Sequence, residues 1–236
     1  MQWSDEGIVL SARPHGETAA IAEVFTRAHG RHLGLVHGGR SRLKRPLLQP
    51  GNHLTVTWRG RLSEQLGTLD VEMKEPYASR LFDRRHGLTG LECLTSLARL
   101  LPERDPHPNL FEVTLFVLGF MEDDDIWPAL YARWELALLQ ELGFGLDLST
   151  CAVTGTSEDL AYVSPRTGRA VSVVAAAPYQ DKLLRLPAIF TGAGVKGANR
   201  VEIDDALLLT GHFLTRDVLA PRGLAFPDAR ARLLGM

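Results

Sequence analysis

The residues of this 236-residue chain that most clearly suggest chemistry form a short basic loop. Residues 30–45 read GRHLGLVHGGRSRLKR, an alternating stretch followed by a double glycine and then by four cations within six positions. A polyanion that meets such a loop releases several condensed counterions, which favours its binding. The loop alone does not distinguish a nucleic-acid-binding edge from a solvated basic loop. The four cations are Arg40, Arg42, Lys44 and Arg45.

The charge of the chain is unevenly distributed, although its formal net charge is only −2. Residues 1–62 contain nine basic and four acidic residues, whereas residues 81–150 contain five basic and twelve acidic residues. Residues 151–236 are close to balanced, with ten basic and eight acidic residues. A basic N-terminal part joined to an acidic middle predicts that only one face of the protein meets a polyanion.

The other reactive side chains do not form a catalytic or metal-binding constellation. In an extended strand His32 and His37 point to opposite faces, so they cannot share a metal and are expected on the basic surface, partly protonated near phosphates. Cys93 lies in an apolar stretch, where an inert buried thiol is expected, and no G-x-S-x-G motif is present. We therefore expect no enzyme activity, no catalytic residue, no metal and no cofactor.

The acidic run at residues 122–125 leaves one alternative open. Carboxylate oxygens suit hard divalent cations, and together with the histidines they would give a metal-dependent hydrolase. Acidic residues before a helix are also stabilised by the helix dipole, and this is the favoured interpretation. Metal analysis combined with a nuclease assay separates the two.

The elements expected to position the basic loop are five short strands in the first 76 residues. Their alternating or β-branched runs are separated by Gly and Pro, and closure of such a sheet removes its exposed edges. The expected fold is an OB-like barrel, a class that binds oligonucleotides on one face and its flanking loops. The predicted strands are residues 7–13, 18–27, 32–37, 53–59 and 66–73.

From about Tyr77 the pattern becomes helical. Residues 111–121 are apolar on most faces and are expected to form a buried central helix. Further helical segments are predicted at residues 88–101, 128–142, 178–190 and 202–219. The expected fold class is α+β with several domains: an OB-like domain at 1–76, a helical domain at 77–148 and 178–236, and a hairpin insert at 149–177.

The hairpin insert has the spacing of a zinc ribbon without its ligands. Cys151 and Thr154, and then Ser172 and Ala175, stand at the C-x2-C spacing of a four-cysteine site, but only one of the four is a cysteine. A single thiolate cannot hold structural zinc. The hairpin, with a turn at residues 164–168, is therefore expected to be held by side-chain packing.

The sequence predicts a protein of the cytosol. Its longest apolar runs are far shorter than the roughly 20 residues that cross a bilayer. Residues 1–7, MQWSDEG, lack the basic region and apolar stretch of a signal peptide, and two cysteines agree with a reducing compartment.

Several local sequences resemble the RecO family of DNA repair and recombination mediators. They are GRHLGLVHGGRSR, LQPG, ELALLQELGFGLDL, CAVTG, DLAYVSPRTGRAVS, HFLTRDVLAPRG and PDARARLL, which together span nearly the whole chain. The resemblance implies a non-enzymatic, nucleoid-associated protein that binds single- and double-stranded DNA and anneals complementary strands. It also implies action with RecR and the single-stranded DNA-binding protein, which together help to load RecA.

The loop and the resemblance together predict the binding residues. Contacts to DNA are expected to be mainly with phosphates, because no cluster of exposed aromatic residues accompanies the loop. An OB-type RNA-binding or translation accessory protein would carry the same loop and is the alternative. The expected DNA-binding residues are Arg31, His37, Arg40, Arg42, Lys44 and Arg45, with Arg27 and Arg59 as weaker candidates. For the single-stranded DNA-binding protein, a hydrophobic pocket rimmed by an arginine is expected, with Arg133, Trp134, Arg216 and Arg222 as candidates.

Overall fold

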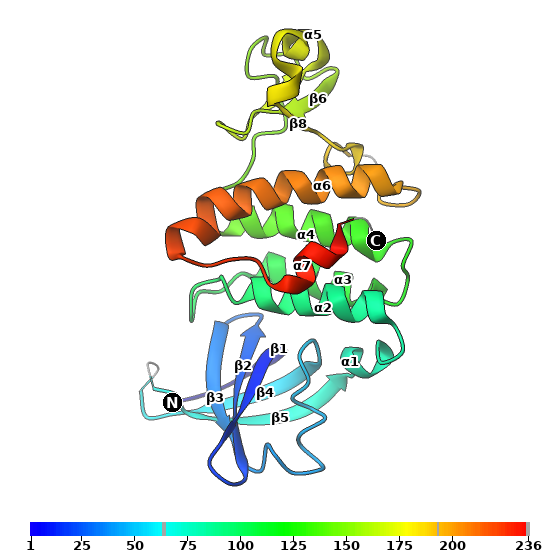
Figure 1. The fold of residues 1–236 in the computed structure, drawn as a ribbon. Coiled ribbons are helices and arrows are strands. Elements are labelled where there is room, and N and C mark those ends of the chain that lie inside the picture. The colour runs from blue at the N-terminus through cyan, green and yellow to red at the C-terminus, as the bar shows by residue number, and fades with distance from the viewer. Residues whose placement is uncertain (63–64, 193, 235–236) are drawn as a thin grey trace. The chain divides into compact units, whose positions relative to one another are not determined.

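The structure is a computed structural model that describes residues 1–62, 65–192 and 194–234. Its backbone contacts divide the chain into two compact units, Met1–Glu122 and Asp123–Met236. The first unit holds a sheet followed by helices, and the second is mainly helical with a small sheet (Figure 1). This agrees with the α+β class. The four-part domain division stays a prediction.

The sheet of the first unit is a closed five-stranded barrel. Its strand order is β1-β2-β3-β5-β4, and β1 pairs with both β2 and β4, which closes the circle. All five predicted strands are present, consistent with an OB-like barrel. The first strand begins five residues earlier than predicted because its N-terminal half pairs with β4 and its C-terminal half with β2. The strands are β1 (Gln2–His15), β2 (Ala19–Thr26), β3 (Gly30–Val36), β4 (His53–Arg59) and β5 (Thr68–Glu75).

Alternation along the strands produces the barrel core. In β4, Leu54, Val56 and Trp58 are buried whereas the intervening threonines are partly exposed, as the period of two predicts. Gly34 is needed where β3 crosses β5 to close the barrel, because a Cβ at this position would lie 2.7 Å from the Cβ of Leu69. This close approach explains a glycine in the middle of a strand.

Three helices complete the first unit: α1 (Tyr77–Arg80), α2 (Arg85–Ala98) and α3 (Pro108–Phe120). Helix α3 packs against the barrel through Phe111, whose ring lies 5.5 Å from that of Phe25, centroid to centroid. The prediction of a buried central helix is wrong, because Phe116 is 56% exposed and Val113 and Phe120 are also exposed. The apolar sequence of α3 serves one packed face and one face open to solvent.

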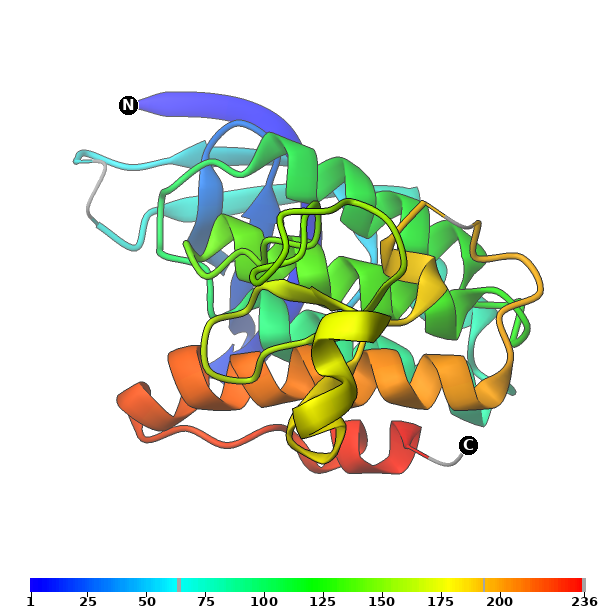
Figure 2. The same ribbon diagram turned by 90° about the horizontal axis from the view of Figure 1, so that it is seen from above.

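The second unit is built on two long helices, α4 (Trp127–Glu141) and α6 (Arg200–Phe213). After α6 the chain turns back, so that α7 (Asp228–Leu233) lies beside α6 in both views (Figures 1 and 2). The expected hairpin is confirmed: β6 (Leu160–Val163) pairs antiparallel with β7 (Ala170–Ser172). A short helix, α5 (Val173–Ala176), follows it directly.

The helix predicted at residues 178–190 is wrong. The chain there forms a 3-10 turn at Ala177–Lys182, a short strand β8 (Leu184–Arg185) and another 3-10 turn at Ala188–Phe190. Pro187, inside the segment, lacks the N–H donor that a continuous helix would need there, and it disfavours helical backbone at Leu186. Strand β8 instead pairs with β6 and adds a third strand, from outside the predicted insert, to the hairpin sheet. Within the described residues, no helix is long and apolar enough to cross a bilayer.

Candidate nucleic-acid interface

The loop between β3 and β4, residues 37–52, folds back on the barrel. The N–H of Arg40 donates to the carbonyl of Thr18 at 3.0 Å, which ties the loop to the β1–β2 turn. Further along, Leu48 inserts into the barrel core and the Asn52 side chain donates to the Pro46 carbonyl at 2.9 Å. The loop is therefore fixed by hydrogen bonds and one buried leucine, while its cations remain at the surface.

The Gly38–Gly39 pair allows this fold. Gly38 has a φ of +66°, a conformation that L side chains rarely adopt. A Cβ on Gly39 would lie 2.8 Å from the Cβ of Ala20, so the loop could not approach β2 as closely. The double glycine thus serves a tight turn and a close backbone approach at the end of β3.

The cations of the loop have no acidic partner among the described residues. In the part of the chain that the structure describes, Arg40, Arg42, Lys44 and Arg45 form no ion pair, and Arg40 donates only to the carbonyl of Gly16, at 2.7 Å. No described carboxylate therefore compensates their charges. The three arginine side chains are exposed to solvent, and that of Lys44 is partly exposed. Such a group attracts phosphate because no local carboxylate competes for it.

A fifth cation, Arg13, joins this group and was missed from the sequence. It lies near the end of β1 and, with Arg40 and Arg45, lines a pocket of about 500 Å³ that has no acidic residue in its lining. The pairing of Arg13 with Ile21 across the β1–β2 hairpin is what places it there. The sequence signal was available only through that register. We call Arg13, Arg40, Arg42, Lys44 and Arg45 the basic patch, and this pocket the basic pocket.

Three other predicted DNA-binding residues are neutralised by carboxylates. Arg27 pairs with Glu6 at 2.9 Å and also with Glu112, and Arg59 pairs with Asp70 at 2.5 Å. Arg31 is only 16% exposed, pairs with Glu23 and donates its Nε to the Leu101 carbonyl at 2.9 Å. Arg31 therefore links the barrel to the segment after α2. This pairing disfavours a contact between Arg31 and phosphates, which stays a prediction.

The two histidines of the loop region separate as the strand period predicts. His37 follows the end of β3 and is exposed beside the basic patch. His32 is buried with the rings of Trp3 and Trp58, so the expectation that it decorates the surface is wrong. Burial, with smaller contributions from the charges of nearby basic groups, lowers the pKa of His32 to about 4.

A pH dependence of stability follows from His32. The unfolded chain takes up a proton on this residue near pH 6.5, whereas the folded chain does so only near pH 4. The folded state is therefore expected to lose stability as the pH falls from about 6.5 towards 4. Thermal unfolding at pH 7 and pH 5 checks this, with His32→Phe as the variant whose stability changes less over that range. An equal change in both proteins would contradict the assignment.

The aromatic cluster around His32 does not offer a surface for bases. Trp3 stacks on His29 with a centroid distance of 4.1 Å and lies 5.9 Å from Trp58 at a small interplanar angle. Neighbouring rings thus already stack against the indole of Trp3. The cluster stabilises the barrel, and its rings are not presented for stacking with a nucleic acid.

The predicted partner-binding residues lie in different environments. Trp134 is fully buried in the second unit, so the expectation that its ring lines a surface pocket is corrected. Arg133 and Arg222 are exposed. Arg216 is held between Asp217 and the Pro165 carbonyl, and its guanidinium lies 4.8 Å from the centre of the Phe213 ring.

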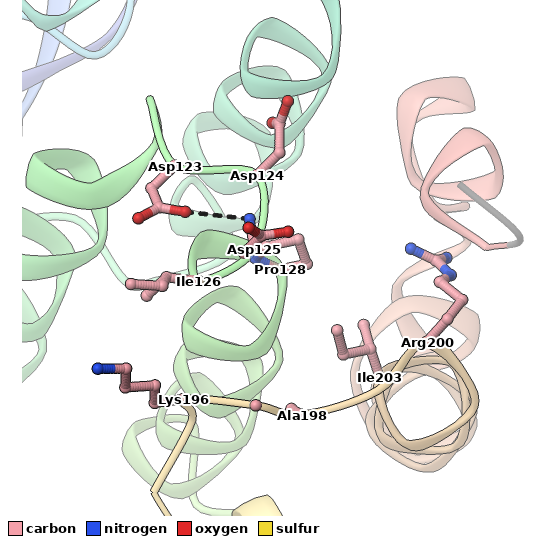
Figure 3. A pocket seen from close by; sticks show the side chains of 10 residues that line it. Asp123, Asp124, Asp125, Ile126, Pro128, Lys196, Ala198, Arg200 and Ile203 are labelled. Atoms are coloured by element: carbon pink, nitrogen blue, oxygen red, sulfur yellow. Dashed lines mark hydrogen bonds between the residues drawn. The ribbon is translucent and has the colours of Figure 1, made fainter.

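The three aspartates of the acidic run, Asp123 to Asp125, precede α4 and line a pocket of about 660 Å³ in the second unit (Figure 3). The carboxylates of Asp123 and Asp124 point in different directions in this view. Asp123 accepts from the N–H of Asp125 at 3.1 Å, and Asp124 accepts from the Trp127 indole at 2.9 Å. Their contacts are those of a turn that precedes a helix. Among the described residues, no group of three or more His, Cys, Asp or Glu could hold a metal ion.

The sulfur of Cys151 lies beside the would-be ligand positions of the insert. It accepts hydrogen bonds from the N–H of Ser172 at 3.3 Å and from its hydroxyl at 3.4 Å. Burial raises the pKa of the Cys151 thiol, but hydrogen bonds from Ser172 and Thr154 outweigh burial and lower that pKa to about 6. One thiolate with hydroxyl donors around it favours hydrogen bonding over zinc ligation.

Comparisons with known proteins agree with the barrel and the helical part that follows it. Residues 1–77 match the family model described as Recombination protein O N terminal, and residues 86–223 match Recombination protein O C terminal. This chain belongs to the recombination protein O family. The basic patch lies within residues 1–77, the part that matches the N-terminal family model.

Curated relatives of this RecO-family chain match it over nearly its full length. Proteins named DNA repair protein RecO are 54% identical in Mesorhizobium japonicum and 52% identical in Beijerinckia indica subsp. indica, covering 99% of this chain in each case. These matches cover 92% and 94% of the relatives. A relative of the same name in Methylorubrum extorquens is 49% identical over all of this chain and 98% of its own length.

Proposed function

We propose that this chain is a DNA-binding recombination mediator in DNA repair that acts at the nucleoid. It binds single- and double-stranded DNA mainly through phosphates, anneals complementary strands and, with RecR, helps to load RecA onto DNA coated by the single-stranded DNA-binding protein. The observation that carries this proposal is the basic patch, five cations without an acidic partner among the described residues at one end of a five-stranded barrel. The names of the relatives support the DNA repair role.

The chemistry of the basic patch suits annealing. Arginine and lysine at phosphates screen the repulsion between two strands, and they leave the edges of most bases free to find their complements. Gly38 and Gly39 let the backbone of the loop lie close to β2, so the four loop cations are held on a fixed support. A loop whose backbone is already ordered loses little backbone entropy when the strand binds.

The partner proposals rest on the family and on exposed residues of the second unit. Arg133, Arg216 and Arg222 are the candidates for the single-stranded DNA-binding protein, because arginines recognise carboxylates through paired N–H donors. Arg216 would exchange its present pair with Asp217 for a carboxylate of the partner. The insert is proposed to be a degenerate zinc ribbon without metal. Its support is the hydrogen bonding of Thr154 and Ser172 to the sulfur of Cys151, since all three stand at ligand positions of the four-cysteine spacing.

The test of the proposed function is strand annealing of two complementary oligonucleotides, with and without the single-stranded DNA-binding protein. The chain is expected to accelerate annealing in both cases. Alanine variants of Arg133, Arg216 and Arg222 are expected to slow only the reaction on strands coated by the single-stranded DNA-binding protein. RNA is added as a competitor in the same assay. If RNA displaces single-stranded DNA efficiently and annealing is absent, the chain is an OB-type RNA-binding protein instead.

A further inference from the structure

A second cavity of the first unit lies next to the basic pocket. Its volume is about 850 Å³, and residues of β1, the β3–β4 loop, β5, α1 and α2 line it. Most of its lining is apolar, in contrast to the basic pocket. The principal apolar residues are Leu10, Met73, Pro76, Phe82, Leu88 and Leu91. We call this cavity the apolar groove.

The apolar groove and the basic pocket share a wall. Arg45, Gln49 and Pro50 line both cavities, so a ligand can extend from one into the other across this wall. Arg45 forms no ion pair with a described residue, and its guanidinium is therefore available at the boundary. The basic pocket contributes Arg13 and Arg40, the shared wall contributes Arg45, and the apolar groove contributes a broad apolar surface.

The groove also presents an aromatic ring to solvent. Phe82 is 82% exposed and Leu88 is also exposed, although both line the groove. The cations of the groove differ in availability, since Arg99 pairs with Glu23 at 2.7 Å whereas Arg45 forms no ion pair in the part of the chain that the structure describes. A carboxylate, Glu92, also lies in the groove lining. A phosphate is therefore favoured in the basic pocket and disfavoured in the groove, where a flat uncharged group would fit.

We propose that the apolar groove receives an unstacked base of single-stranded nucleic acid while a neighbouring phosphate lies in the basic pocket at Arg45. Phe82 supplies a face for the base, because every base has a π-face and stacking on aromatic side chains tolerates any sequence. This inference rests on the proposed function, because it describes how the same DNA-binding surface discriminates between single-stranded and double-stranded DNA. It gives the chain a preference for single strands, since a base in a duplex must first be unpaired and unstacked at a cost of a few kcal/mol.

The inference refines the expectation that base contacts are negligible. Phe82 was not recognised from the sequence because it stands between α1 and α2, far from the basic loop along the chain. The fold brings it to the groove that the loop helps to line. Contacts with the phosphates still provide most of the affinity, and the groove selects between single and double strands.

The decisive variant is Phe82→Ala, with Phe116→Ala as the matched control. Both phenylalanines are exposed in the first unit, but Phe116 is on α3 and lines neither the groove nor the basic pocket. Affinity is measured for a single strand of mixed sequence and for a blunt duplex of the same sequence. Phe82→Ala is expected to weaken single-strand binding by about fivefold or more, as loss of one stacked base predicts, and to leave duplex binding unchanged. Phe116→Ala is expected to change neither.

A spectroscopic readout supports the same test. In Phe82→Trp, the added indole is expected to be quenched when a single strand binds, beyond any quenching of wild-type tryptophans, and not when the duplex binds. The proposal is overturned if Phe82→Ala changes the affinities for the single strand and for the duplex equally, or changes neither. It is also overturned if the fluorescence of the added indole is not quenched. Arg45→Ala separates this failure from failure of the proposed function: it weakens binding of both DNAs if the basic patch binds DNA at all.

Discussion

Replacement of Arg230 by methionine is expected to destabilise the second unit by about 3–5 kcal/mol. Arg230 is buried in α7 and pairs with Glu135 of α4, which is fully buried. The methionine would leave the carboxylate in the interior without its counter-charge. Removal of one partner from a buried pair is costly because the remaining charge is desolvated and unpaired.

The geometry around Glu135 explains why this effect should be large. Arg230 donates its Nε to one carboxylate oxygen at 2.6 Å and an Nη to the other at 2.9 Å. Tyr131 and Thr210 each donate a hydroxyl to the same carboxylate, at 2.7 Å and 2.5 Å. Of these donors, only the two hydroxyl groups would still donate to Glu135 in the variant, and a neutral hydroxyl cannot replace a cation. The network therefore fastens α7 to α4 and α6, the last short helix to the two long ones.

Urea unfolding followed by near-ultraviolet circular dichroism measures the effect. The control is Arg232→Met, which changes an exposed arginine of the same short helix and is expected to alter the free energy of unfolding little. The double variant Glu135→Leu with Arg230→Met removes both charges and is expected to be more stable than Arg230→Met alone. Equal stability of Arg230→Met and Arg232→Met would show that the pair does not support α7.

This buried pair marks a boundary of what the sequence can predict. Arg230 and Arg232 stand two positions apart in a basic tail, and nothing local separates the buried arginine from the exposed one. The distinction comes from Glu135, which lies 95 residues away along the chain. The barrel strands were predictable because their burial follows a period of two within each segment.

The same limit governs the candidate interface. The four loop cations were predictable because they are close together in sequence and no acid accompanies them. Arg27 and Arg59 looked similar, yet Glu112 and Asp70 neutralise them from other elements. Arg13 joined the basic patch only through the register of a hairpin. Local composition therefore predicted the loop, and tertiary pairing decided which other arginines remain available.

Replacement of the four loop cations by alanine is expected to cause the largest loss of DNA affinity. The variant is Arg40→Ala, Arg42→Ala, Lys44→Ala and Arg45→Ala together. The slope of log affinity against log salt is negative, and each lost phosphate contact reduces its magnitude by about 0.7 to 0.9. Four lost contacts therefore reduce the magnitude by about 3. If the lines for wild type and variant meet near 1 M salt, affinity at about 0.1 M salt falls by about a thousandfold.

The fold should tolerate these changes. The loop is held to the barrel by backbone hydrogen bonds and by Leu48, and the four charged groups contribute no ion pair with a described residue. Of the side-chain hydrogen bonds that these four residues make to described residues, only the bond from Arg40 to the Gly16 carbonyl is lost. An unchanged melting temperature would therefore show that the loss of affinity reflects the charges and not unfolding.

The matched control is the double variant Arg27→Ala with Arg59→Ala, which removes two barrel cations that already pair with carboxylates. Because their charges are compensated in the free protein, a phosphate must compete with Glu6 and Asp70 for them. The salt slope of this control is expected to stay near that of the wild type. Titration of a fluorescent single strand from about 0.05 to 0.2 M salt gives both slopes. If the control has a less steep salt dependence than the wild type and the loop variant does not, the phosphates lie at Arg27 and Arg59 and not at the basic patch.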